Sequence, residues 1–161
     1  MHDMNDRARD RESDPRQAAV IPVRLDSRAG VQACLIRRKN SGKWGIPKGY
    51  IERDASWKRA ALDEAFEEAG LSGEIVGESI GTYVYTKGVV SLTVVVFVME
   101  VLDERTPWQE MRWRERRWCS LEEAGALLVG HRVWPLFDSI RSSLATMLSD
   151  PLPPSGAGTS S

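Results

Sequence analysis

Three glutamates, Glu64, Glu67 and Glu68, lie three and four residues apart, and Gly70 follows them after one alanine. On an α-helix this spacing puts the three carboxylates on one face, close to the C-terminal end. Helix C-termini already carry about half a negative charge, so carboxylates are unfavourable there. A divalent cation such as Mg²⁺ takes oxygen ligands and would convert the repulsion into coordination. The spacing therefore indicates a metal site.

The element that carries these glutamates is predicted to be a helix over residues 55–69. Asp54 is the expected N-cap, because a short polar side chain satisfies free N–H groups at a helix start. Gly70 is the expected residue past the end, since glycine adopts the left-handed conformation that ends many helices. Leu62 and Phe66 lie on an apolar stripe that would face a core.

The rest of the chain alternates between strand-like and helix-like patterns. Strands are predicted over residues 18–25, 31–39, 75–85, 92–101 and 114–119, and further helices over residues 120–128 and 133–148. The β-branched run 92–101 indicates a central strand buried on both faces. The order predicts an α+β protein, an α/β/α sandwich with a mixed central sheet between helices.

Length and composition favour one globular domain. The chain has 161 residues, 42% hydrophobic and 28% charged, enough for a substantial core. The polar residues 1–16 are expected to form a disordered arm and the Pro/Gly/Ser-rich residues 149–161 a disordered tail, which leaves residues 17–148 as the domain.

Charge and hydropathy exclude several classes of protein. The formal net charge of −1 gives no electrostatic case for nucleic acid or an anionic membrane. No apolar run approaches the roughly 18 residues of a membrane span, and the charged N-terminus lacks a signal sequence. Cys34 and Cys119 form no CxxC pair and are expected to be buried, reduced thiols. These features favour a cytoplasmic protein.

Residues 49–71 (GYIERDASWKRAALDEAFEEAGL) resemble the Nudix box, G-x5-E-x7-R-E-U-x-E-E-x-G-U with U aliphatic. The positions that match in register are Gly49, Glu64, Glu67, Glu68, Gly70 and Leu71. The approach WGIPKG and the stretch around residues 118–124 also resemble the family, so the resemblance covers residues 18–148. It implies the Nudix fold.

Two positions depart from the box. Ala55 stands where the family has its first Glu, and Asp63 stands where it has Arg. In the family these two side chains pair and help to orient the glutamates. Because both ends of the pair are absent, no charge is left without its partner. Asp63 nevertheless adds a negative charge beside the expected ligands, and Arg59 is positioned to neutralise it at i, i+4.

The resemblance implies a metal-dependent hydrolase of a nucleoside diphosphate derivative or a related pyrophosphate compound. By similarity, Glu64, Glu68 and the Gly49 carbonyl would bind Mg²⁺ or Mn²⁺. Glu67 would bind a second ion or act as the base for water, so Glu64 and Glu67 are the expected catalytic residues. The approach to the box most resembles the branch that acts on diphosphoinositol polyphosphates and dinucleoside polyphosphates.

Basic residues near the box are candidates for binding phosphate. Lys48 immediately precedes Gly49, while Arg24 ends the first predicted strand and Arg37, Arg38 and Lys39 end the second. Together they could grip a polyphosphate, although solvent-exposed strand ends explain the same residues equally well. The expected partner is thus a small phosphorylated molecule, and the sequence leaves the oligomeric state open.

Two further matters stay open at this level. Glu110 and Glu115 are candidates for an extra carboxylate at the site, although each is also a typical surface residue. His131 could contact substrate or simply flank the last helix. The alternative to an enzyme is a catalytically weak Nudix-fold module with a ligand-binding or regulatory role. The departure from the signature at Asp63 favours this alternative.

Overall fold

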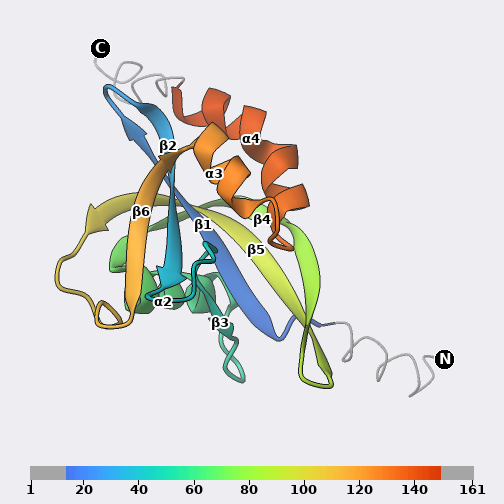
Figure 1. Ribbon diagram of the computed structural model, residues 1–161. Helices are drawn as coiled ribbons and strands as arrows, with labels where there is room; N and C mark the ends of the chain where they lie inside the picture. The colour runs from blue at the N-terminus through green and yellow to red at the C-terminus, as the bar shows by residue number, and fades with distance from the viewer. Residues whose placement is uncertain (1–13, 150–161) are drawn as a thin grey trace, which may run out of the picture.

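The computed structural model describes residues 14–149 as a sheet between helices (Figure 1). Most of the predicted arm and tail lies outside the described residues. Residues 14–16 lead directly into the sheet, where the Arg16 N–H donates to the Thr93 carbonyl at 2.9 Å. No helix within residues 14–149 is long and apolar enough to cross a membrane.

The sheet has six strands in the order β4-β5-β1-β2-β6, with β3 paired to β1. Strand β1 runs parallel to β5, whereas the other pairs are antiparallel, so the predicted mixed sheet is confirmed. The strands are β1 (Gln17–Asp26), β2 (Gly30–Arg38), β3 (Lys48–Tyr50), β4 (Leu71–Lys87), β5 (Val90–Glu104) and β6 (Arg114–Ser120).

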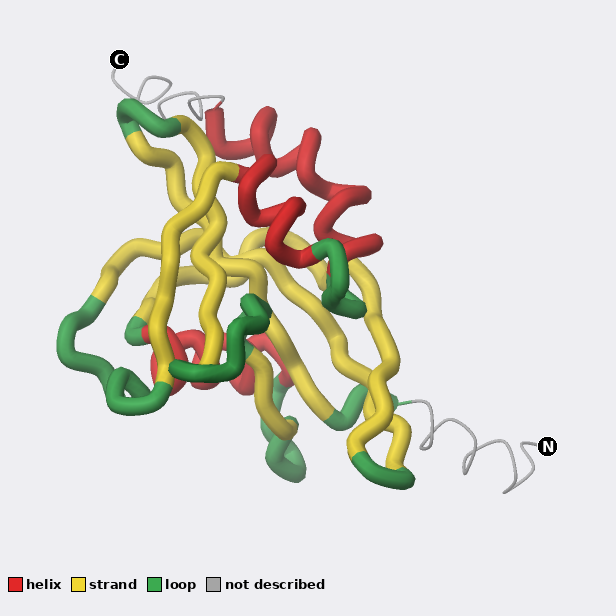
Figure 2. The backbone as a smooth tube through the Cα atoms, viewed as in Figure 1, coloured by secondary structure: helices red, strands yellow, loops and turns green. Residues whose placement is uncertain are grey.

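Within residues 14–149, three helices cover the two faces of this sheet, in the arrangement that Figure 2 shows. Helix α2 (Trp57–Ala69) packs on one face, and α3 (Leu121–Leu128) with α4 (Trp134–Ser149) packs on the other. Alternation along β1 serves both layers: Ala18 and Val20 face α2, while Ala19 and Ile21 face α3 and α4. The predicted α/β/α sandwich is therefore confirmed.

The sequence also predicted β5 and the thiols well. Residues 94–99 of β5 are buried on both faces of the sheet. Cys34 and Cys119 are buried and form no disulfide. Strand β4 starts earlier than expected, directly after Gly70, and changes register between Ser72 and Gly73 and again between Val76 and Gly81. These irregularities hid its full length, because they interrupt the period-two pattern.

The predicted start of α2 was wrong by two residues. Ser56, not Asp54, is the N-cap, and its hydroxyl accepts a hydrogen bond from the Arg59 N–H at 3.0 Å. Asp54 instead has φ of 70°, a left-handed turn conformation that short polar residues tolerate. The Glu52 carbonyl accepts from the Ala55 N–H, which makes a turn before the helix.

Replacing Ser56 by Ala removes the oxygen that caps α2. We expect Ser56→Ala to lower the free energy of unfolding by about 1 kcal/mol, measured by urea denaturation. Ser56→Thr keeps a capping hydroxyl and serves as the control, with stability close to that of the wild type. Equal stability of the Ala and Thr variants would contradict this assignment of the cap.

Candidate active site

Gly49 is fixed in space by the first two strands. The segment before it makes paired hydrogen bonds between Ile36 and Gly45, at 2.9 and 2.8 Å, and the Val20 N–H donates to the Pro47 carbonyl at 3.1 Å. Gly49 itself then pairs with Ala18 in the β1–β3 ladder. These contacts place the backbone of Gly49 directly over α2.

The carboxyl group of Glu64 packs against the α-carbon of Gly49. A Cβ atom added to Gly49 would lie 2.1 Å from the Glu64 carboxyl carbon and from its Oε1. A side chain at this position would displace the Glu64 carboxyl, so glycine allows the close approach. Gly49 and Glu64, two positions of the signature segment, are thus in direct contact in the fold.

Glu64 and Glu68, one helical turn apart, meet beneath Gly49. Glu68 is 4% exposed, and its burial raises the pKa of the carboxyl to about 8, against the opposing charge of Arg114 and together with a hydrogen bond to Glu64. Burial also raises the pKa of Glu64. Two carboxylates this close repel each other unless a proton or a cation lies between them. Glu67, on the same helix, is half-buried.

The C-terminal end of α2 is tied to the chain around β6. The carbonyl oxygens of residues 67–70 each accept a hydrogen bond from the β5–β6 connection or from β6 itself. The donors are the N–H of Glu110 (3.1 Å), the indole of Trp108 (3.0 Å), the guanidinium of Arg116 (2.8 Å) and the N–H of Arg105 (2.8 Å). These donors offset the negative end of the helix dipole.

Gly70 makes this close contact possible. It has φ of 68°, and an added Cβ would lie 2.6 Å from the Trp108 Cβ and 2.8 Å from the Arg105 carbonyl oxygen. Its predicted role at the end of α2 is therefore confirmed.

Arg114 is a residue of this site that sequence reasoning missed. Its Nε lies 2.8 Å from Glu110 Oε1 and its Nη2 lies 3.6 Å from Glu68 Oε2, with only 16% of the side chain exposed. The available signal was alternation: Arg114, Arg116 and Trp118 share the α2 side of β6.

A pocket of about 350 Å³ opens beside Gly49 and Glu68. Among the described residues that line it, four are basic, one is acidic and two are tyrosines. The basic residues are Arg38, Lys48, Lys87 and Arg114, the acidic residue is Glu68, and the tyrosines are Tyr50 and Tyr85. Gln17, Ile46 and Gly49 complete the lining. The Tyr85 hydroxyl donates to Gln17 at 2.8 Å, and the Lys48 ammonium lies 4.1 Å from the centre of the Tyr85 ring. The excess of positive charge suits an anion with several phosphates.

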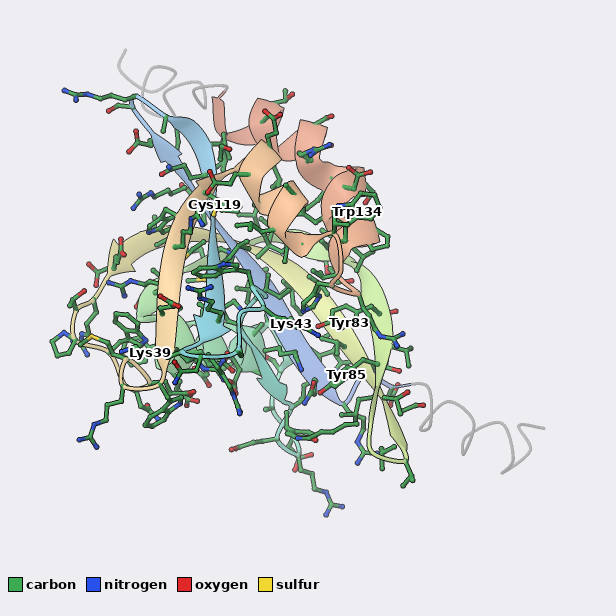
Figure 3. All side chains as sticks on the ribbon, viewed as in Figure 1. Lys39, Lys43, Tyr83, Tyr85, Cys119 and Trp134 are labelled. Carbon is green, nitrogen blue, oxygen red and sulfur yellow. The ribbon has the colours of Figure 1, made fainter. Side chains whose placement is uncertain are left out.

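The predicted phosphate-binding residues separate into groups. Lys48 and Arg38 line the pocket. Arg37 instead pairs with Glu115 and stacks on Trp44, with 4.5 Å from its guanidinium to the ring centre. Lys39 lies beside the start of β6, well apart from Tyr85 in Figure 3. Its backbone N–H donates to the Trp113 carbonyl at 2.9 Å.

The structure does not bring Arg24 to this pocket. Ala18 is the β1 residue paired with Gly49, and Arg24 lies six residues further along β1, about 20 Å away at strand spacing. Its guanidinium pairs with Glu104 at 3.3 Å and stacks on Trp118 at 3.9 Å. The predicted cluster of Arg24 with Arg37, Arg38 and Lys39 is therefore wrong for Arg24, because the antiparallel strands β1 and β2 finish at opposite ends of the sheet.

The remaining candidates also have defined places. The Arg59 guanidinium pairs with Asp63 at 3.0 Å, as the spacing indicated. Glu110 approaches the site through Arg114, whereas Glu115 faces Arg37. His131 is a helix-flanking residue: its Nδ1 accepts from the Val133 N–H at 2.9 Å, and its ring makes an edge contact with Tyr83.

The residues beside Gly49 fit a divalent cation in part. The carboxyl groups of the half-buried Glu64 and the buried Glu68 converge beside Gly49, which has no side chain, and hard cations prefer such oxygen ligands. Within residues 14–149, however, no three His, Cys, Asp or Glu side chains meet closely enough to hold a metal ion. Glu64 and Glu68 are therefore the side chains that would hold a cation here, and a complete site would need further oxygen ligands.

Comparison with known proteins defines the class. The NUDIX domain profile matches residues 14–138, so this chain belongs to the Nudix family. It is 36% identical over 96 residues to Nudix hydrolase 4 of Arabidopsis thaliana, covering 58% of this chain and 46% of that protein. It is 29% identical over 92 residues to mouse (Mus musculus) diphosphoinositol polyphosphate phosphohydrolase 3-alpha, covering 56% and 55%. The chain thus spans about half the length of the curated relatives it matches.

Solved structures agree with the fold. The binary complex of C. elegans Ap4A hydrolase superposes with a TM-score of 0.67 at 20% identity, over 81% of this chain and 97% of that one. The Nudix hydrolase RenU from M. smegmatis superposes with a TM-score of 0.62 at 17% identity, over 83% and 88%. At this identity the likeness is one of fold.

Filling the space at Gly49 tests the contact with Glu64. Gly49→Ala drives a methyl group into the Glu64 carboxyl, so we expect Mg²⁺ affinity, measured by calorimetry, to fall at least tenfold. Gly130→Ala is the matched control, because an added Cβ there meets no atom within 4 Å. Unchanged Mg²⁺ affinity in the Gly49 variant would refute the proposed geometry.

The buried carboxyl of Glu68 makes stability depend on pH. The pKa of Glu68 in the folded state is raised to about 8. Its contribution to the free energy of unfolding is therefore fully present below the pKa of the unfolded state and is lost as pH rises towards 8. Without divalent ions, we expect Glu68→Gln to exceed the wild type in free energy of unfolding at pH 9 by on the order of 2 kcal/mol, and by little at pH 4.5. Urea denaturation at both values checks this, with the exposed Glu74→Gln as control.

Proposed function

We propose that this chain is a divalent-metal-dependent pyrophosphohydrolase. The observation that carries the proposal is the pair of neighbouring carboxyl groups, the half-buried Glu64 and the buried Glu68, held against Gly49 beside a pocket lined by four basic residues. Family membership supports the same reaction class.

Mg²⁺ or Mn²⁺ bound at this pair would polarise a phosphoryl oxygen and activate water. Glu64, Glu68 and the Gly49 carbonyl are the proposed ligands. Glu67 lies on the same helix face and is the proposed further ligand or general base. Trp108 and Arg116 hold the helix end from which these carboxylates project.

Phosphate groups of the substrate are proposed to bind in the pocket of about 350 Å³. Lys48, Arg38, Lys87 and Arg114 provide positive charge there, and Tyr50 and Tyr85 provide aromatic surface. We propose a substrate with several phosphates: a dinucleoside polyphosphate or a diphosphoinositol polyphosphate, the compounds named for two similar proteins, or another nucleoside diphosphate derivative.

A catalytically weak ligand-binding module is the second candidate. One observation favours it: Asp63 stands in place of the signature arginine. Both functions use the same pocket, so binding alone does not separate them.

Turnover separates the two functions. The purified chain is incubated with nucleoside, dinucleoside and inositol pyrophosphates in Mg²⁺ or Mn²⁺, and products are resolved by chromatography. We expect hydrolysis of at least one compound, reduced at least a hundredfold in Glu67→Gln or Glu68→Gln and little changed in the surface variant Glu74→Gln. Ligand binding without turnover in any mixture would support the binding module instead.

A further inference from the structure

The acidic end of α2 lacks a positive charge of its own. Residues 66–69, its last turn, contain no Lys or Arg, although Glu64, Glu67 and Glu68 all project from this end. Arg59 lies within the helix, but its guanidinium faces Asp63. The charge that keeps the carboxylates in place must therefore come from another element.

Strand β6 delivers that charge through Arg114. Its Nη2 lies 3.6 Å from Glu68 Oε2, and its Nε lies 2.8 Å from Glu110 Oε1. The guanidinium thus lies between a buried carboxyl of α2 and a carboxylate of the β5–β6 connection. Its side chain also lines the pocket.

Glu110 is itself firmly held, which fixes Arg114. The Glu110 N–H donates to the Glu67 carbonyl at 3.1 Å, and its own carbonyl accepts from the Arg114 N–H at 3.0 Å. Its Oε1 also accepts from the Trp113 indole at 3.1 Å. Glu110 therefore anchors the guanidinium to the same helix end that carries Glu68.

We propose that Arg114 is a positioning residue for the proposed metal ligands: anchored by Glu110, it keeps the Glu68 carboxylate turned towards Glu64 and Gly49. The inference rests on the proposed function, because it places a cation beside these residues. Arg114 thus provides from β6 the orienting charge that α2 lacks at Asp63.

Two possible roles of Arg114, positioning Glu68 or acting only as a nearby positive charge, predict opposite changes in metal affinity when Arg114 is removed. A guanidinium near a cation site repels the cation, so removing it as a mere bystander would tighten metal binding. If Arg114 positions Glu68, its removal leaves a buried carboxylate without a partner. The carboxylate then turns away from Glu64 and Gly49, and metal binding weakens.

Binding of Mn²⁺ to the full chain at pH 7.5, measured by electron paramagnetic resonance, decides between them. We expect Arg114→Gln to weaken Mn²⁺ binding at least threefold and Arg114→Lys to recover part of the loss. Arg117→Gln removes the same charge from the opposite side of β6, where Arg117 pairs with Glu123, and should change binding less than twofold. Equal or tighter binding by Arg114→Gln, or an equal loss in Arg117→Gln, overturns the proposal.

A second variant keeps the test valid if Arg114→Gln fails to fold. Glu110→Gln retains the guanidinium but weakens its anchor, and we expect a smaller loss of Mn²⁺ affinity in a protein with an unchanged circular dichroism spectrum. Unchanged Mn²⁺ affinity in that folded variant overturns the proposal. If the wild type binds Mn²⁺ but hydrolyses no pyrophosphate, the proposed enzymatic function is wrong. The Mn²⁺ affinities of the variants then still decide whether Arg114 positions Glu68. If the wild type binds no Mn²⁺, both proposals fail.

Discussion

The C-terminal end of α2 concentrates negative charge, and the surrounding structure is arranged to stabilise it. Three glutamates project where four backbone carbonyls have no partner inside the helix. The β5–β6 connection and β6 donate one hydrogen bond to each carbonyl of residues 67–70, from two backbone N–H groups, an indole and a guanidinium. A second guanidinium, that of Arg114, faces Glu68. The helix end is thus neutralised by residues about 40 positions away in the chain.

The opposite wall of the site depends on backbone alone. Gly49 is held by ladder contacts with β1, and the segment before it by contacts with β2. Because it has no side chain, the Glu64 carboxyl packs directly on its α-carbon. The site is therefore a contact between a strand and a helix, and sheet pairing sets the position of the strand.

The sequence predicted the parts of the site that depend on local pattern. Helical spacing grouped the glutamates, and Gly70 ended the helix where expected. Contacts between distant segments were not visible in the pattern. Arg114 looked like an ordinary strand residue, and Arg24 looked equivalent to Arg38 until the antiparallel pairing of β1 and β2 separated them. The cap at Ser56 was missed because Asp54 is an equally good capping residue by type.

The tie between α2 and β6 has a consequence for how the site is made. A growing chain that ends at Leu71 already contains the whole signature segment, yet none of the groups that satisfy residues 67–70 has been synthesised. The geometry of this helix end is thus completed only when β6 pairs with β2 and brings Arg114 and Arg116 alongside the helix. A form of the chain without β6 would contain the signature segment but lack the contacts that hold the end of α2.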